Sequence, residues 1–335
     1  MSTLLITHPA CHEHDTGGGH PERAARLGAV DAGIAAAGLA EAIVRIEAEP
    51  ATDADLALVH PPDLTHRLDA LDRSGGGRID GDTVMSPRSW EAARLAAGAG
   101  LTAVRRLENG DARAAFCAVR PPGHHARPTQ SMGFCLLNNL AITAAHLADR
   151  GDRVLVVDID AHHGNGTQDA FYADGRVSVV SFHEWPLYPG TGRIDELGDG
   201  EGFGANLNVC LPSGSTGDAL RMGIEQVVAP LADRVDPAWL LVSAGFDAHR
   251  ADPLTGMGLS SGDYAEIIAD LGRFVDPGRM ILFLEGGYEL DALARSSAAA
   301  LAATLDLDLK PEAPTSGGGG REAVARAAEV HRRAL

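Results

Sequence analysis

VLVVDIDAHHGNGTQDAF, residues 154–171, holds the strongest structural pattern in the chain. Residues 154–157 form an unbroken apolar run, which is typical of a parallel strand covered on both faces. Asp158, Asp160 and His162 follow at a spacing of two, so in an extended segment their side chains point the same way. They lie at the carboxyl end of the predicted strand, where open α/β sheets bind ligands.

Two carboxylates and an imidazole on one side of a strand end repel one another or stay unsatisfied unless a cation joins them. Asp oxygen and His nitrogen are ligands for zinc and similar divalent ions. The pattern therefore predicts a metal site. The alternative is a structural network in which these Asp and His side chains hydrogen-bond one another.

Short apolar runs and Ala-rich stretches of helical length alternate along the rest of the chain. We predict strands at residues 4–7, 115–119, 154–160, 178–183, 239–243 and 280–284. The clearest helix has Ser86 as its N-cap and Pro87 as its first residue, and Asn109-Gly110 ends it. This alternation predicts a three-layer α/β/α architecture with a central, mostly parallel sheet.

We expect residues 1–335 to form one domain. Its residues 311–320, PEAPTSGGGG, have the composition of a flexible loop. Residues 321–335 predict a C-terminal helix with Val324, Ala327, Ala328 and Leu335 along one face.

Composition restricts the class of protein. Apolar residues make up 45% of the chain and charged residues 22%, as in a globular protein. The formal net charge of −18 argues against binding to a nucleic-acid backbone, and favours cationic partners. No apolar run approaches the ~20 residues of a membrane span, and the first residues lack the pattern of a secretory signal. The four scattered cysteines indicate reduced thiols, so we expect a cytoplasmic protein.

A second constellation is WLLVSAGFDAHRADPLTG, residues 239–256, in which an apolar run leads to Asp247. Neighbouring parallel strands lie ~4.8 Å apart, so carboxylates at two strand ends can share one ion. Asp247 is therefore the expected third ligand beside Asp160 and His162. Taken alone, an Asp in this place is more often a helix cap or a loop organiser.

Two further stretches carry groups suited to catalysis. RPPGHHARPTQSMGFCLLNN, residues 120–139, presents His124 and His125 after a stiff Pro-Pro-Gly turn, and imidazoles suit general acid and base chemistry. FLEGGYELD, residues 283–291, presents Tyr288, whose hydroxyl can donate to a developing oxyanion. Taken alone, a His pair of this kind more often lies on the surface without a catalytic role, and a Tyr in this place is more often an aromatic residue at the edge of the core.

Together these stretches resemble the zinc-dependent histone deacetylase family of the arginase–deacetylase superfamily. The resemblance runs through HPER (20–23), DTVMSP (82–87), RPPGHH (120–125), GFC (133–135), DIDAHHGNGTQ (158–168), YPGTG (188–192), SAGFDAH (243–249) and EGGY (285–288). It covers roughly residues 5–305 and is strongest to the class II branch, which includes bacterial histone deacetylase-like amidohydrolases. It implies the arginase–deacetylase fold.

The resemblance implies a role for each site residue. The zinc ligands are Asp160, His162 and Asp247. The catalytic set is His124, His125, Tyr288, Asp158 and Asn165. Within it, His125 is the general base, His124 assists proton transfer, and Tyr288 holds the substrate carbonyl. Asp158 stands behind His124 and Asn165 behind His125. An amide in the second place removes a negative charge that would raise the pKa of the imidazole.

The resemblance also implies substrate and cation sites. Gly133, Phe134 and Tyr188 line a narrow channel suited to lysine's methylenes, and Asp82 at its rim grips substrate backbone N–H groups. A potassium site uses Asp158, Ser181 and Phe182 together with Asp160 and His162. A second one uses the carbonyls of Phe171, Asp174 and Val177. Cys135 fits a channel wall better than a nucleophile.

The leading hypothesis is a metal-dependent amidohydrolase that removes an acetyl or related acyl group from a lysine side chain of a peptide or protein. An acetylpolyamine amidohydrolase is the second reading, although Leu254 offers no carboxylate to a polyamine. A binuclear manganese enzyme of the arginase type leaves the His pair unexplained. A pseudoenzyme that only binds acyl ligands also stays open. The ligand set suits both zinc and iron(II), and the oligomeric state is not indicated.

Overall fold

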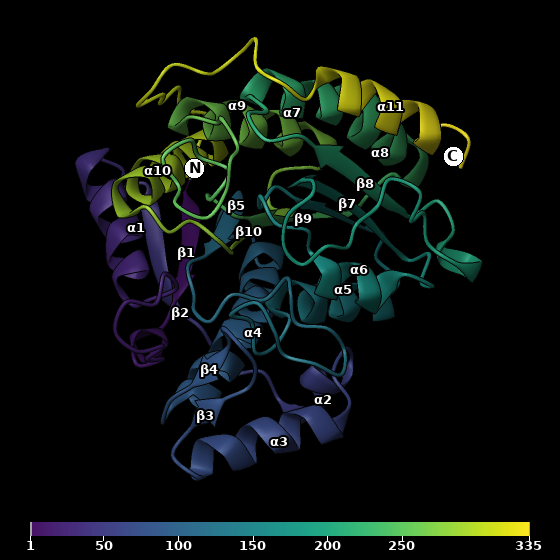
Figure 1. The fold of residues 1–335 in the computed structure, drawn as a ribbon. Helices are drawn as coiled ribbons and strands as arrows, with labels where there is room; N and C mark the ends of the chain where they lie inside the picture. The colour runs from purple at the N-terminus through teal and green to yellow at the C-terminus, as the bar shows by residue number, and fades with distance from the viewer. Residues whose placement is uncertain (1, 335) are drawn as a thin grey trace.

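The computed structural model describes residues 2–334, and its centre is an eight-stranded parallel sheet (Figure 1). The strand order is β2-β1-β5-β10-β9-β6-β7-β8, and every neighbouring pair is parallel. The strands are β1 (Thr3–Thr7), β2 (Ile43–Glu47), β5 (Ala114–Cys117), β6 (Val154–Asp158), β7 (Val177–Glu184), β8 (Asn206–Leu211), β9 (Trp239–Ala244) and β10 (Met280–Leu284). The predicted α/β class with a parallel sheet is confirmed.

Helices cover both faces of this sheet (Figure 1). One layer holds α1 (Ala25–Ala36), α7 (Gly217–Gly223), α8 (Ala229–Val235), α9 (Ser261–Leu271), α10 (Leu290–Thr304) and α11 (Arg321–His331). The other holds α4 (Ser89–Glu108), α5 (Asn139–Asp149) and α6 (Asn165–Phe171). Beyond α4 lie α2 (Asp53–Ala57), α3 (Pro62–Arg73) and a small hairpin of β3 (Gly77–Arg78) and β4 (Val84–Met85). The three-layer prediction is confirmed.

Short helical turns complete the chain. Three are 3-10 turns, at Pro9–His12, Gly200–Gly202 and Gly272–Phe274, and one π-helical turn, Ile224–Val228, joins α7 to α8. No helix within residues 2–334 combines the length and apolar character that crossing a bilayer requires.

The core follows from the apolar strands. All five residues of β6 and of β10 are buried, as are all six of β9. Each buried Val or Leu side chain contributes roughly 1.5–3 kcal/mol relative to an exposed one. These central strands are therefore held rigidly, and the loops at their carboxyl ends start from fixed points.

Several predicted boundaries are wrong by a few residues. The strand predicted at 154–160 ends at Asp158, and the one predicted at 115–119 ends at Cys117. The helix predicted from Pro87 begins at Ser89, because Arg88 takes a left-handed conformation (φ 74°) and Ser86 uses its hydroxyl to accept from the N–H of Asp15. Neither of the two edge strands, β2 and β8, was predicted.

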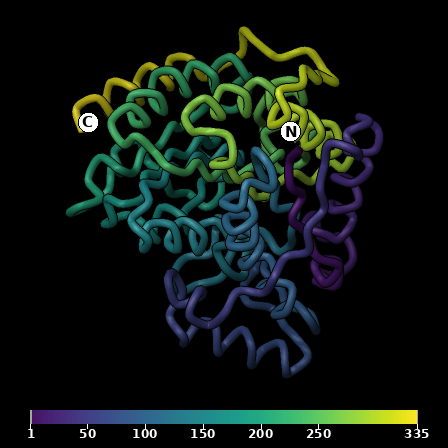
Figure 2. The backbone as a smooth tube through the Cα atoms, turned by 180° about the vertical axis from the view of Figure 1, so that it is seen from behind, coloured from purple at the N-terminus to yellow at the C-terminus, as the bar shows by residue number. Residues whose placement is uncertain are grey.

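The C-terminal part of the chain folds back along the outside of α9 and α7 (Figure 2). Residues 311–320 form neither helix nor strand. The following helix ends at His331 and not at residue 335, and its face of Val324, Ala327 and Ala328 is buried as expected. Leu335, predicted on that face, lies outside the described residues.

Candidate active site

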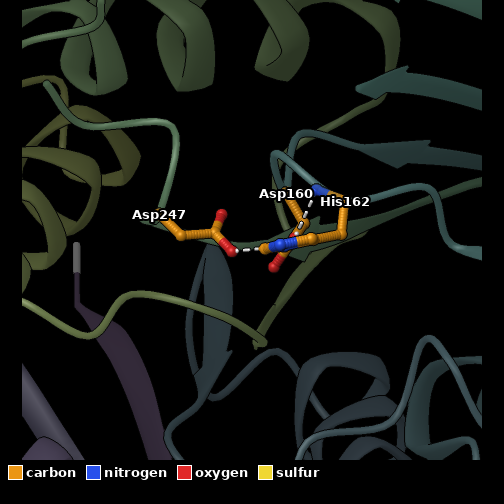
Figure 3. Close-up of side chains that lie close together, drawn as sticks. All are labelled: Asp160, His162 and Asp247. Carbon is orange, nitrogen blue, oxygen red and sulfur yellow. Dashed lines mark hydrogen bonds and ion pairs between the residues drawn. The ribbon is translucent and has the colours of Figure 1, made fainter. Parts of the chain in front are cut away.

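Three side chains from two loops meet at the carboxyl end of the sheet (Figure 3). Asp160 and His162 follow β6, and Asp247 follows β9, which pairs directly with β6. His162 Nδ1 lies 3.2 Å from Asp160 Oδ1 and 2.9 Å from Asp247 Oδ2. One donor atom from each residue lies within 4.8 Å of the others, and all three residues are buried. The structure thus brings together the three predicted ligands.

Backbone N–H groups orient both carboxylates. Asp160 Oδ2 accepts from the N–H of Gly286 at 2.7 Å, and Asp247 Oδ1 accepts from the N–H of Ala161 at 2.9 Å. Gly286 approaches so closely that a Cβ on it would lie 2.2 Å from Asp247 Oδ2. A glycine is therefore required at this position by lack of space.

The donor set suits a divalent cation. Burial opposes a charged imidazole, yet hydrogen bonds to Asp160 and Asp247 raise the pKa of His162 to about 11. Burial would likewise raise the pKa of the Asp160 carboxyl, but His124 and His162 hold that pKa well below its usual value. The two carboxylates thus demand a positive charge at this point. A divalent metal ion would supply that charge and would allow His162 to coordinate as a neutral ligand.

His124 and His125 lie beside this cluster with their rings 4.0 Å apart, on the loop after β5. Their partners are the predicted ones: His124 Nδ1 lies 3.0 Å from Asp158 Oδ2, and His125 Nδ1 lies 2.7 Å from Asn165 Oδ1. The His125 ring lies 6.0 Å from that of His162. The Asp158 carboxylate thus contacts His124 and is not part of the cluster of Asp160, His162 and Asp247.

The two histidines differ in charge. Burial lowers the pKa of His125, and the nearby His124 lowers it further, so this ring is neutral. Burial acts the same way on His124, but Asp160 and Asp158 outweigh it and raise the pKa of His124 to about 10. When the Nδ1–H of a neutral His125 donates to Asn165, its Nε2 carries the lone pair that a general base needs.

A buried carboxylate that sequence reasoning missed fixes the histidine loop. Glu285, directly after β10, accepts from the N–H of Gly123 at 2.7 Å and of His124 at 3.1 Å. Its side chain is fully buried, which raises the pKa of Glu285 to about 7. The EGGY motif was read only for Tyr288, although a charged residue directly after an apolar strand is itself a signal.

Tyr288 stands at the end of the same turn as Gly286. Its N–H donates to Asp252 Oδ2 at 2.8 Å, and the guanidinium of Arg26 lies 5.1 Å from its ring centroid. Arg26 is fully buried and donates to the carbonyls of Gly287 and Glu285. Arg26 and Asp252 were missed, because only the fold brings near the backbone atoms of the Tyr288 turn that they contact.

Arg26 belongs to a buried ion cluster centred on Glu22. The Glu22 carboxylate accepts from both Arg26 and Arg120, and all three side chains are fully buried. Burial alone would raise the pKa of Glu22, but the two guanidinium groups lower it to about 2. This cluster ties the HPER segment to the turn that carries Tyr288.

Aromatic rings flank the predicted channel. The Tyr188 ring stands edge-on to His125 at 5.1 Å, and the Phe134 ring lies 5.9 Å from that of Tyr288. Gly133 has φ +57° and would place a Cβ 2.5 Å from His125 Cδ2, so only glycine fits there. Phe134 also has a positive φ of 68°, and Thr83 fixes it by accepting from its N–H. Burial raises the pKa of the Cys135 thiol well above its usual range, so it carries no nucleophilic thiolate.

Asp82 lies beside this channel, half-buried, on the segment between β3 and β4. His20 Nε2 lies 3.0 Å from its backbone carbonyl oxygen, and the ring of His20 packs 4.7 Å from that of Phe134. Burial raises the pKa of the Asp82 carboxyl, and Asp80 raises it further. The predicted rim residue is thus joined to the channel wall.

Some of the residues predicted to bind potassium are neighbours in the sheet. Ser181 pairs with Asp158 across β7 and β6, and Phe182 is buried next to it. In the second predicted site the carbonyl of Phe171 already accepts from the N–H of Asp174 at 3.0 Å. Both potassium sites stay predictions.

Comparisons with known proteins agree with this geometry. A family model described as "Histone deacetylase domain" matches residues 20–304. A "Probable deacetylase" of Archaeoglobus fulgidus is 37% identical over 92% of this chain and 88% of its own length. A "Histone deacetylase-like amidohydrolase" of Pseudomonas aeruginosa is 39% identical over 72% of this chain and 65% of its own length. The crystal structure of the HDA15 HD domain superposes with a TM-score of 0.91, at 33% identity, over 99% of this chain and 94% of that one.

Proposed function

This chain belongs to the histone deacetylase family, and on that premise we propose that it is a zinc-dependent amidohydrolase that removes an acetyl or related acyl group from a lysine side chain. The family and the names of the relatives support a deacetylase or amidohydrolase activity on acetylated amides. What we propose beyond this activity is that the metal is zinc and that the acyl group is carried by a lysine side chain.

One observation supports the proposal above all others: a buried Asp160–His162–Asp247 cluster lies beside a neutral imidazole. The cluster provides the donor types and the spacing for one divalent ion. The Nδ1 of His125 faces Asn165, which leaves the other ring nitrogen to take a proton. A ligand triad next to an oriented base is the arrangement that metal-assisted hydrolysis needs.

In the mechanism we propose, zinc, when bound, makes water more acidic and polarises the amide carbonyl. His125 accepts a proton from the attacking water at Nε2. Tyr288 donates a hydrogen bond from its hydroxyl to the carbonyl oxygen as negative charge develops there. His124, charged beside Asp158, donates a proton to the departing amine. The products are a carboxylate and a free amine, and no covalent enzyme intermediate forms.

Lysine is our proposed acyl carrier because of the channel. Phe134 and Tyr188 provide aromatic surfaces that suit an aliphatic stem. Asp82 at the rim offers a carboxylate to substrate backbone N–H groups, and the net charge of −18 favours basic peptides. Potassium held by Asp158, Ser181 and Phe182 together with Asp160 and His162 is part of the same proposal.

A turnover panel tests the proposal. The purified chain, loaded with zinc or with iron(II), is given an acetyl-lysine peptide, longer acyl-lysine peptides and acetylated polyamines. We expect about one metal ion per chain and turnover of an acyl-lysine peptide that a chelator abolishes and zinc restores. Faster hydrolysis of acetylated polyamines would replace the lysine proposal with the polyamine one. Bound metal with no turnover on any substrate would show a binding protein instead.

A further inference from the structure

The C-terminal strap, residues 311–320, lies beyond the family match and is fastened to the start of α9. The hydroxyl of Ser260 donates to the Ala313 carbonyl at 2.8 Å. Thr315 donates to the Asp263 carboxylate through its N–H at 2.9 Å and its hydroxyl at 2.7 Å, and accepts from the N–H of Gly217 at 2.9 Å. The strap is therefore joined to two helices.

One residue of the strap reaches further toward the active site. Glu312 Oε2 accepts from His249 Nε2 at 2.7 Å and from the N–H of Ser261 at 3.0 Å. Its Oε1 accepts from Arg250 at 2.5 Å. The N–H of Ala251 donates to His249 Nδ1 at 3.1 Å, which places the ring proton on Nε2, where it faces Glu312.

His249 lies in the loop that follows β9 and holds two active-site groups. This side chain is 1% exposed, so Glu312 is the acceptor that its buried N–H requires. Two residues before it stands the ligand Asp247. Three residues after it, Asp252 donates its N–H to the His249 carbonyl at 2.8 Å.

Asp252 connects this loop to the catalytic tyrosine. Its carboxylate accepts from the N–H of Tyr288 at 2.8 Å and from the N–H of Leu254 at 3.0 Å. Glu312, His249, Asp252 and Tyr288 thus form a continuous series of hydrogen-bonded contacts from the strap to the proposed oxyanion donor.

We propose that Glu312 is a positioning residue that acts through His249 to hold the loop of residues 247–256, and with it Asp252 and Tyr288, in the geometry that turnover needs. This inference rests on the proposed function, since Tyr288 matters to the rate only if it touches the reacting carbonyl. The bond to the exposed Arg250 is screened by solvent and adds little. The contact with the buried His249 is the one that matters.

The test uses the full chain loaded with zinc and an acetyl-lysine peptide. Glu312→Ala leaves the buried His249 N–H without its acceptor, and we expect kcat to fall by about 10- to 100-fold with KM within about 2-fold, since misplacement of a catalytic group costs rate before binding. Glu312→Gln keeps a carbonyl oxygen for His249 and Ser261 and should restore kcat to within about 3-fold. Equal losses in both variants would contradict the role assigned to this contact.

Thr315→Val is the matched control. It removes the hydroxyl contacts of Thr315 with Asp263 and Gly217, keeps the backbone N–H bond to Asp263 and leaves Glu312 in place, so its kcat should equal that of the parent. A loss as large as that of Glu312→Ala would show that general detachment of the strap, and not Glu312, affects the site. If Glu312→Ala does not fold, His249→Phe removes the same N–H and should reproduce the fall in kcat.

Hydrogen–deuterium exchange and zinc content give readouts that do not depend on activity. In Glu312→Ala the amides of residues 247–256 should exchange faster than in the parent, with zinc content unchanged and β6 unaffected. Unchanged exchange in that loop would overturn the inference. A parent chain that hydrolyses no acyl-lysine peptide would instead refute the proposed function, while the exchange result would still decide the role of Glu312.

Discussion

Gly286→Ala is the sharpest test of the candidate metal site, because the new methyl group has no space. The added Cβ would lie 2.2 Å from Asp247 Oδ2 and 2.6 Å from Asp160 Oδ2, where ordinary contacts are 3.4–4 Å. Both proposed ligands must therefore move by roughly 1 Å. Ligand distances in metal sites tolerate only about ±0.2 Å, so neither carboxylate keeps its coordination geometry.

The size of the effect follows from what smaller disturbances cost. Loss of a hydrogen-bond partner behind a ligand lowers metal affinity by about 10- to 100-fold. Displacement of two ligands should cost at least about 100-fold. The assay is a zinc titration against a competing chelator on protein whose circular dichroism shows it to be folded.

The control is Gly28→Ala on α1, where an added Cβ meets no atom within 4 Å. This variant should bind zinc like the parent, and its helix gains about 1 kcal/mol because Ala suits a helix interior better than Gly. Folded Gly286→Ala that binds zinc with the affinity of the parent would show that the cluster of Asp160 and Asp247 is not the metal site.

Three further changes test other parts of the structure. Tyr288→Phe should lower kcat by about 10²- to 10³-fold with zinc content unchanged, since it removes an oxyanion donor; an unchanged kcat would exclude Tyr288 from the mechanism. Gly133→Ala, whose Cβ would lie 2.5 Å from His125 Cδ2, should lower kcat at least about 10-fold without loss of zinc, and an unaffected kcat would contradict the packing argument. Glu22→Gln should lower the free energy of unfolding by about 3–5 kcal/mol, because it leaves two buried guanidinium groups without a counter-charge. This loss corresponds to a melting temperature lower by roughly 4–7 °C. Because the folded-state pKa of Glu22, about 2, is lower than its ordinary value, this difference should be complete above about pH 4.5 and shrink as the pH falls toward 2; a melting difference that does not change with pH would contradict it.

The central strands could be predicted from the sequence because their apolar runs are unbroken, and the ligands because they stand directly after those runs. The two edge strands of the sheet, β2 and β8, could not. In β2, IVRIE, three of the five residues are exposed, and β8, NLNVCL, carries Asn206 and Asn208, which hydrogen-bond Gln168. Side chains of this kind do not give the pattern of a buried strand.

The first turn of α4 shows how tertiary contacts override local signals. Ser86-Pro87 is a good helix start by itself. In the fold the Ser89 hydroxyl hydrogen-bonds both His14 and the N–H of Ser86, and the helix starts at Ser89, two residues later than predicted. The carboxylates of Glu285 and Asp252 were missed for a related reason: their partners are backbone N–H groups from loops distant in sequence.

Four carboxylates, the missed Glu285 and Asp252 together with the predicted Asp160 and Asp247, explain how four separate loops hold one geometry. The loops after β5, β6, β9 and β10 leave four adjacent strands of the sheet. A carboxylate of one loop accepts from a backbone N–H of another in each case: Asp160 from Gly286, Asp247 from Ala161, Asp252 from Tyr288 and Glu285 from His124. Asp247 Oδ1 and both oxygens of Asp160 thus accept from backbone N–H groups, which fixes the orientation of both proposed carboxylate ligands. The protein's own amides therefore orient the side chains of the candidate site, because each of the four loops is fixed to a neighbouring one by such a hydrogen bond.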